Sequence, residues 1–245
     1  MNRSLQRLAA LALGGLLSAP ALASVVINGT RVVYPGHDRE VTVQLSNQGD
    51  SPALVQSWMD KGDPKSTPEQ SDAPFVLTPP ITRIEPGRGQ TLRMMYTGQP
   101  LPADRESVFW LNVLEVPPIP AGEARSYVQL AFRSRIKVFF RPAGLPGQAG
   151  EAGGKLHWHA AAGAGGQVTL ACENASPYYV SFSRLAVGAE GQTSAYGQGG
   201  MVAPFSKAAF PIPGLSRPPA AGSVVEVSTI NDYGGGELVK AKLEP

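Results

Sequence analysis

The pattern that most constrains this chain is a series of short runs in which apolar and polar residues alternate. Arg39–Leu45, Gln90–Tyr96 and Glu106–Val116 are three of them, and the runs of the first half follow one another every 8–15 residues or so. Alternation with a period of two is typical of a half-buried β-strand. Glycine (28 residues) and proline (23 residues) punctuate the runs, and no segment has a convincing helical pattern. We therefore expect an all-β protein with a β-sandwich architecture.

The chain is long enough for two such domains, and its composition changes between them. The alternating runs of this 245-residue chain continue to Pro142, after which Gly144–Gly166 is rich in glycine and alanine. Short runs resume at Gln167. We predict a first sandwich over residues 24–143 and a smaller one over residues 144–245, with part of the intervening segment forming a loose hairpin.

The first residues have the features of a signal peptide. Arg3 and Arg7 form a basic start, Leu8–Leu17 is apolar but too short to span a bilayer, and residues 21–23 (Ala-Leu-Ala) resemble a cleavage site. We expect residues 1–23 to be removed and the mature protein to be exported, without membrane insertion.

The charge balance argues against one class of partner, and the cysteine count excludes one kind of covalent link. Residues 1–23 hold two arginines and no acid, so 19 basic and 19 acidic residues remain after cleavage. A neutral chain lacks the basic field of nucleic-acid-binding proteins, and we expect no nucleic-acid partner. The single cysteine, Cys172, excludes an internal disulfide, so the fold must rely on its hydrophobic core.

The stretch Tyr127–Pro142 (YVQLAFRSRIKVFFRP) carries the main functional prediction. Val128, Leu130 and Phe132 alternate with more polar residues, as in a strand with one apolar face. Natural edge strands avoid a long apolar row because it invites another chain to pair with it. We interpret this stretch as a strand that is lent to a partner.

Two cations lie within apolar, strand-like stretches. Arg31 follows Thr30 and precedes two valines, and Lys137 lies between Ile136 and Val138. A cation in a strand is usually a solvent-facing residue. Two cations that met in one cleft would instead form an anion site, and an arginine can bind a carboxylate with two parallel hydrogen bonds.

Catalytic and metal-binding patterns are weak. His157 and His159 share a strand face and are candidate metal ligands, but an ordinary surface pair is the simpler interpretation because no further ligand stands at a supporting spacing. Cys172, in the apolar run TLAC, is typical of a buried structural thiol. No nucleophile-elbow, phosphate-loop or zinc-protease motif occurs. We expect no enzyme, no cofactor and no metal.

Several motifs resemble the PapD-like family of periplasmic pilus-assembly chaperones. Leu101–Pro117 (LPADRESVFWLNVLEVP) is similar to the family pattern L-P-x-D-R-E-S-x-x-[FYW]-x-N-[LIV]-x-x-[LIV]-P. Ile136–Pro142 (IKVFFRP) and Thr78–Gly87 (TPPITRIEPG) resemble two further segments of the first domain. Ser176–Val180 and Ile230–Gly235 resemble segments of the second.

The resemblance implies two immunoglobulin-like sandwiches in an L or boomerang arrangement, with a cleft between them. It also implies a periplasmic chaperone that binds, folds and caps pilus or fimbrial subunits by donating a β-strand. Such a chaperone delivers its subunit to an outer-membrane usher without nucleotide or cofactor.

The resemblance assigns roles residue by residue. Arg31 and Lys137 match the pair that holds the C-terminal carboxylate of a subunit. Val128, Leu130 and Phe132 match the donor residues that fill the groove of a subunit lacking its own last strand.

Three further residues, Glu106, Arg141 and Asp232, match a buried ionic link between the domains. The short loop Pro118–Ser126 and the lack of a cysteine pair are similar to the short-loop subfamily. An exposed apolar row also makes a self-capping dimer plausible.

Two questions stay open. The donor residues are even-numbered and Lys137 is odd-numbered, so either a bulge intervenes or the cation and the donor row serve different surfaces. The main alternative function is a secreted structural or adhesive surface subunit with tandem sandwiches. It would share the signal peptide and the strand pattern, but it explains neither the two cations nor the Leu101–Pro117 match.

Overall fold

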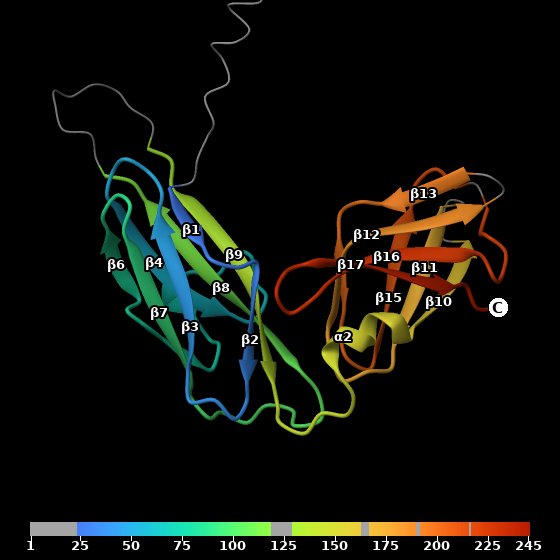
Figure 1. Ribbon diagram of the computed structural model, residues 1–245, viewed down its shortest axis with the longest axis horizontal. Coiled ribbons are helices and arrows are strands. Elements are labelled where there is room, and N and C mark those ends of the chain that lie inside the picture. The colour runs from blue at the N-terminus through green and yellow to red at the C-terminus, as the bar shows by residue number, and fades with distance from the viewer. Residues whose placement is uncertain (1–23, 119–128, 163–166, 190–191, 216) are drawn as a thin grey trace, which may run out of the picture.

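The computed structural model describes residues 24–118, 129–162, 167–189, 192–215 and 217–245 (Figure 1). The predicted signal peptide, Val128 and most of the loop Pro118–Ser126 lie outside the described residues. The described part is built almost entirely of short strands in two sandwiches, which confirms the all-β prediction. Within it, no helix has the length and hydropathy needed to cross a membrane.

The first sandwich packs a four-stranded sheet, in the order β1-β3-β7-β5, on a five-stranded sheet, in the order β2-β9-β8-β4-β6. Tyr34 and Phe140 stack in its core, between the two sheets, and Phe75 packs edge-on against both rings. The elements are β1 (Val25–Ile27), β2 (Arg31–Pro35), β3 (Val41–Asn47), β4 (Ala53–Asp60), the 3-10 turn η1 (Pro68–Gln70), β5 (Phe75–Thr78), β6 (Ile81–Ile84), β7 (Gly89–Tyr96), β8 (Ser107–Val116) and β9 (Phe132–Arg141).

The second sandwich has a three-stranded sheet, β10-β11-β15, and a five-stranded sheet, β13-β12-β16-β17, in which β14 also pairs with β12. Trp158, Phe182 and Phe210 lie in its separate core. The elements are α2 (Ala149–Ala152), the 3-10 turn η2 (Gly153–Lys155), β10 (Leu156–Ala162), β11 (Val168–Asn174), β12 (Val180–Ala189), β13 (Gln192–Tyr196), β14 (Gly200–Val202), β15 (Ser206–Ile212), β16 (Val224–Ile230) and β17 (Gly236–Lys242).

The Gly- and Ala-rich segment between the domains contains one arm of a hairpin, as predicted for part of it, but also a helical turn that was not predicted. It contains α2, followed by η2 and then β10, which pairs antiparallel along its whole length with the next strand, β11. Ala152 is buried in the second core, so a small side chain lets the turn pack there. A four-residue helix is too short to leave a periodic signal in the sequence.

The chain changes sheets between β1 and β2. β1 pairs with β3 in one sheet, and β2 pairs with β9 in the other. The crossing falls at Asn28-Gly29, a dipeptide typical of turns, where Gly29 has a φ of +122°, a value open mainly to glycine. As a result, Arg31 begins a parallel strand beside the middle of β9, and the first half of β9 is left without that neighbour.

The two sandwiches meet at one end and diverge from there, which gives the boomerang shape seen in Figure 1. The loop between β16 and β17 reaches the first domain at this junction. A Cβ at Gly234, where φ is +84°, would lie 2.4 Å from the Thr30 hydroxyl, so the close approach requires glycine. Glu106 also donates its amide to the Pro177 carbonyl (2.9 Å).

Candidate functional site: the cleft and the open edge of β9

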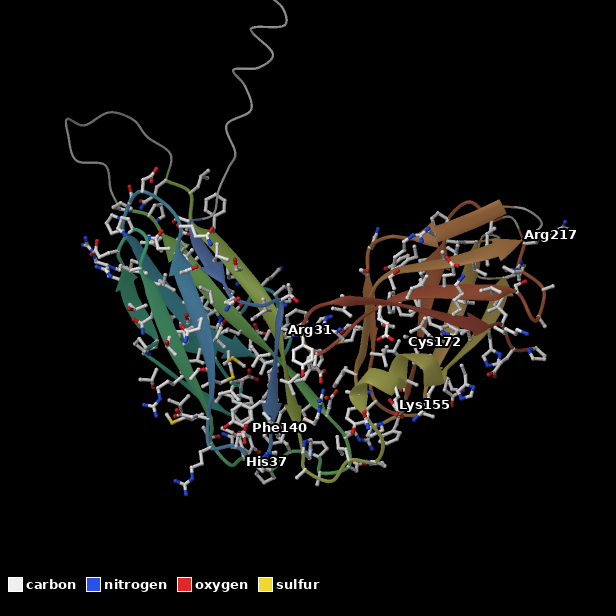
Figure 2. The ribbon with its side chains drawn as sticks, viewed as in Figure 1. Arg31, His37, Phe140, Lys155, Cys172 and Arg217 are labelled. Carbon is white, nitrogen blue, oxygen red and sulfur yellow. The ribbon has the colours of Figure 1, made fainter. Side chains whose placement is uncertain are left out.

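A cavity of about 320 Å³ lies between the two sandwiches at their junction. Its first-domain wall comes from β2 and β9, through Arg31, Phe139 and Arg141. Its second-domain wall includes Ser181 of β12 and residues around the β16–β17 loop. Figure 2 shows the Arg31 side chain on the first-domain side, facing the second sandwich.

Strand register places Arg31 beside Lys137. The two are direct partners in the parallel pairing of β2 with β9, so their side chains leave the same face of the sheet. Both cross the cleft: Arg31 Nη1 donates to the Ile230 carbonyl (2.9 Å), and Lys137 Nζ donates to the Ser181 hydroxyl (3.4 Å). Among the described residues neither cation has a carboxylate partner, and Arg31 Nε is buried without a hydrogen bond.

The surroundings of these two cations favour an incoming anion. Burial lowers the pKa of Arg31, and the charges of Asp232 and Glu106 offset only part of that effect. Burial also lowers the pKa of Lys137, and the adjacent Arg31 lowers it further. Each direction means that the charged form lacks the stabilisation it has in water. A carboxylate between the two would supply that stabilisation through charge-assisted hydrogen bonds.

The residues expected to link the domains lie together at the base of the cleft. Arg141 donates from Nε to Glu106 (2.6 Å) and from both terminal nitrogens to Asp232 (2.8 and 2.9 Å). Glu106 is buried and also accepts the Tyr179 amide (2.7 Å). Burial alone would lower the pKa of Arg141, but its hydrogen bonds with Asp232 and the charge of Glu106 raise it. Both acids bond directly to Arg141, and neither forms an ion pair with Arg31 or Lys137.

The strand predicted from Tyr127 begins only at Phe132. Its antiparallel partner β8 ends at Val116, where Glu115 pairs with Phe132. Pro117 and Pro118 follow and have no amide hydrogen to extend the ladder. Leu130 therefore precedes the strand and is 60% exposed, while Phe132 is 45% exposed.

The first half of β9 has an open edge. β2 pairs only with residues 137–141 of β9, so the edge at residues 132–136 faces no other strand of the described chain. Such an edge presents unpaired backbone groups that another chain can bind. It leads directly to Lys137, so the open edge and the cation pair are continuous.

The pairing of β8 with β9 shows why the predicted donor residues are even-numbered while Lys137 is odd-numbered. The pairing of β8 with β9 runs from Phe132 to Phe140 without a shift, so no bulge intervenes. Phe132 shares its face with Val138 and Phe140, which are in the core, whereas Lys137 points to the opposite face. Phe132, one of the predicted donor residues, and Lys137 therefore lie on opposite faces of the same strand.

The weaker candidates have structural roles. His157 contacts Glu244 (2.6 Å) and His159 contacts the Pro245 carbonyl (3.1 Å), which holds the C-terminal residues beside β10. No group of three or more metal-ligating side chains occurs among the described residues. Cys172 is buried in the second core, and burial raises the pKa of its thiol to about 12, so it is not a nucleophile at neutral pH.

Sequence reasoning missed the residues beneath Lys137. Trp110 lies opposite Lys137 in the register of β8 with β9, and the Lys137 ammonium is 5.6 Å from the centre of the Trp110 ring. Arg135 lies over the same ring at 4.2 Å. Alternation within β8 was visible in the sequence, but which residues meet across two strands depends on register, which a single strand does not reveal.

Family comparisons agree with this architecture. Residues 24–146 match the family described as "Pili and flagellar-assembly chaperone, PapD N-terminal domain", and residues 151–239 match "Pili assembly chaperone PapD, C-terminal domain". The chain belongs to the PapD family of pilus-assembly chaperones, which confirms the resemblance. It is accordingly a chaperone and not an enzyme.

Individual relatives are similar over nearly the whole length. The probable fimbrial chaperone YadV of Escherichia coli K12 is 45% identical over 230 residues, 92% of both chains. The chaperone protein FimB/FhaD of Bordetella pertussis is 42% identical over 96% of both chains. The crystal structure of the YadV chaperone has a TM-score of 0.77 at 43% identity and covers 90% of this chain and 100% of its own.

A further solved structure contains a subunit. It is the Salmonella enterica SafA pilin in complex with the SafB chaperone. The matched chain is 31% identical with a TM-score of 0.74, and the match covers 92% of this chain and 99% of that one.

Proposed function

We propose that this chaperone binds a pilus or fimbrial subunit by holding the subunit's C-terminal carboxylate between Arg31 and Lys137 and pairing the open edge of β9 with the subunit. One observation carries the proposal. Arg31 and Lys137 lie in register and are partly desolvated, and their hydrogen-bond partners across the cleft are neutral groups. They stand at the end of an unpaired strand edge, so one extended peptide can meet both features. The SafA–SafB complex supports the partner class.

The apolar residues and the carboxylate anchor contribute differently to the binding free energy. Burying Leu130 and Phe132 in a subunit groove is worth about 1.5–3 kcal/mol for each side chain. Association itself costs at least about 4 kcal/mol. Apolar contact alone is therefore marginal, and the carboxylate anchor supplies the remaining affinity. The anchor also fixes register, because a paired strand can otherwise slip by two residues.

Export and delivery complete the proposal. Residues 1–23 direct the chain to the periplasm and are removed, and domains 24–143 and 144–245 form the mature chaperone. The subunit is handed to an outer-membrane usher, where a neighbouring subunit's extension replaces the lent strand.

In the free protein a second copy of the chaperone covers the exposed Leu130 and Phe132 side chains. Sedimentation should therefore show a concentration-dependent dimer that dissociates when a subunit binds.

The experiment that tests the proposal is co-purification from the periplasm of cells that express the candidate subunits. Tagged chaperone should recover a small β-rich subunit in near-equal amount, identified by mass spectrometry. A tagged Lys155→Ala variant is the control, because this exposed lysine pairs with Glu151 on the second domain. Failure of the wild-type protein to recover any subunit would instead favour a surface-subunit role.

Replacing Leu130 with aspartate should weaken subunit binding by tenfold or more. The substitution removes an apolar side chain worth about 1.5–3 kcal/mol on burial and adds a charge that must be desolvated. Titration of purified subunit against both forms, followed by calorimetry, measures the change. Leu238→Asp is the matched control, because Leu238 is similarly exposed (56% against 60%) but lies on β17 of the second domain. Equal losses in the two variants would refute a specific donor role for Leu130.

Subunit affinity should fall as the pH rises into the alkaline range. The fall should begin at a pH below the one at which an ordinary lysine loses its charge. Burial and Arg31 lower the pKa of free Lys137, whereas a bound carboxylate stabilises its charged form. Binding is therefore coupled to proton uptake once the pH passes that lowered pKa, and the lost affinity grows as pH rises. Calorimetry in buffers of different ionisation enthalpy measures the proton uptake. A Lys137→Arg variant should shift the decline to higher pH, and an unchanged profile would count against Lys137 as the titrating group.

A further inference from the structure

A buried polar cluster of the first domain lies on the cleft-facing side of its five-stranded sheet. Its centre is Asp60, which is 1% exposed. Asp60 forms a two-point ion pair with Arg135 (2.5 Å and 3.2 Å) and accepts hydrogen bonds from Asn112 (2.7 Å) and the Gly62 amide (2.6 Å). Burial alone would raise the pKa of Asp60, but these hydrogen bonds lower it and keep the carboxylate ionised.

Arg135 contacts both Asp60 and the Trp110 ring. Its guanidinium lies over the indole, 4.2 Å from the ring centre, and the bidentate pair with Asp60 holds the guanidinium in place. Because Asp60 neutralises Arg135, the guanidinium contacts the ring without adding net charge near the cleft. The position of the Arg135 guanidinium over the ring therefore limits where the Trp110 indole can lie.

The fixed indole contacts one of the two anchor cations. Lys137 is the cross-strand partner of Trp110, and its ammonium is 5.6 Å from the ring centre. The other groups near this ammonium are the like charge of Arg31 and the hydroxyl of Ser181 at 3.4 Å. A lysine side chain has a flexible four-carbon stem, and a desolvated ammonium gains most from an aromatic face.

We propose that Trp110 is a positioning residue for the carboxylate anchor: its indole, clamped by the Asp60–Arg135 pair, holds the Lys137 ammonium charged and directed into the cleft. This inference rests on the proposed function, and it adds residues that contact no subunit themselves. A rigid ring limits the positions of the ammonium before binding, so less freedom is lost when the carboxylate arrives.

The first test needs no subunit. Nuclear magnetic resonance of the Lys137 side chain reports its pKa in the free protein. Trp110→Leu should lower that pKa by about one unit, since a desolvated cation–aromatic contact is worth about one tenfold step or more. Trp110→Phe keeps an aromatic face of similar burial and should restore part of the loss. Equal Lys137 pKa values in the leucine and phenylalanine variants would overturn the role of the ring.

The second test measures anchoring with a synthetic peptide of alternating apolar and polar residues that ends in a free carboxylate, beside its C-terminal amide. Trp110→Leu should weaken binding of the acid by about 10- to 30-fold. In a Lys137→Ala background the same substitution should change nothing further. Trp158→Leu is the control for the loss of a buried indole, because Trp158 belongs to the core of the second domain and does not line the cleft.

The outcomes separate the two proposals. If the wild-type protein binds acid and amide equally, the carboxylate anchor itself is wrong, whatever the pKa measurement gives. If the acid is preferred and Trp110→Leu weakens it equally with and without Lys137, the tryptophan acts through general stability and the positioning role is refuted.

Discussion

Replacing either anchor cation with alanine should abolish subunit capture and leave the protein folded. Removing one partner of a desolvated, hydrogen-bonded charge pair costs about 2–5 kcal/mol, which is a loss of roughly 30- to 4,000-fold in affinity. Lys137→Ala removes one of two cations, and the remaining Arg31 still contacts Ile230. Purified subunit titrated against the variant, with far-ultraviolet circular dichroism to verify the fold, measures both effects.

The conservative variant Arg31→Lys refines this prediction. A lysine keeps the charge but cannot donate two parallel hydrogen bonds to a carboxylate, so affinity should be intermediate. Lys155→Ala, which removes an exposed cation of the second domain, should bind like the wild type. A Lys137→Ala protein that captures the subunit at full strength would refute the anchor, and one that unfolds would assign Lys137 a structural role.

Arg141→Ala should destabilise the protein more than any other single substitution considered. The change leaves the Glu106 carboxylate buried, 3% exposed, with only the Tyr179 amide as a hydrogen-bond partner. Breaking a buried ion pair from one side costs about 3–5 kcal/mol. It also removes the contact between Arg141 and Asp232 of the second domain. Denaturant unfolding should show the lower stability, and small-angle scattering should show a wider range of domain orientations.

An exposed ion pair provides the matched control. Arg93 pairs with Glu40 on the surface of the first domain, and Arg93→Ala should leave the unfolding midpoint unchanged within error, since exposed pairs contribute little. If Arg141→Ala behaves in the same way, with unaltered scattering, the cluster at the base of the cleft does not hold the domains together.

The sequence predicted the parts of the fold that depend on local alternation. β8 and β9 lie close to the expected segments because their apolar faces meet a core, and the Asn28-Gly29 turn is where the chain changes sheets. The start of β9 was predicted about five residues too early. Alternation continues through Leu130, but Pro117 ends β8, and no strand of the described chain pairs with residues 129–131.

Site residues could be predicted where a cation in an apolar run also belonged to a family motif. They could not be predicted where their place depends on which residues face each other across two strands. Arg31 and Lys137 stood out as cations in apolar runs, and the motifs placed them in one cleft. The position of Trp110 beneath Lys137 required the pairing of β8 with β9. Asp60 lay at the end of a strand and would pass for a surface residue, yet it is buried because Arg135 and Asn112 converge on it from neighbouring strands.

The most direct test of strand donation is backbone amide hydrogen exchange at residues 132–136 of β9, in the free chaperone and in its complex with a subunit. In the free protein, the amides that point away from β8 face no strand of the described chain and should exchange fast. If the strand is donated, the subunit should protect these amides strongly, while β16 of the second domain changes little. A stable complex in which residues 132–136 continue to exchange as in the free protein would contradict strand donation.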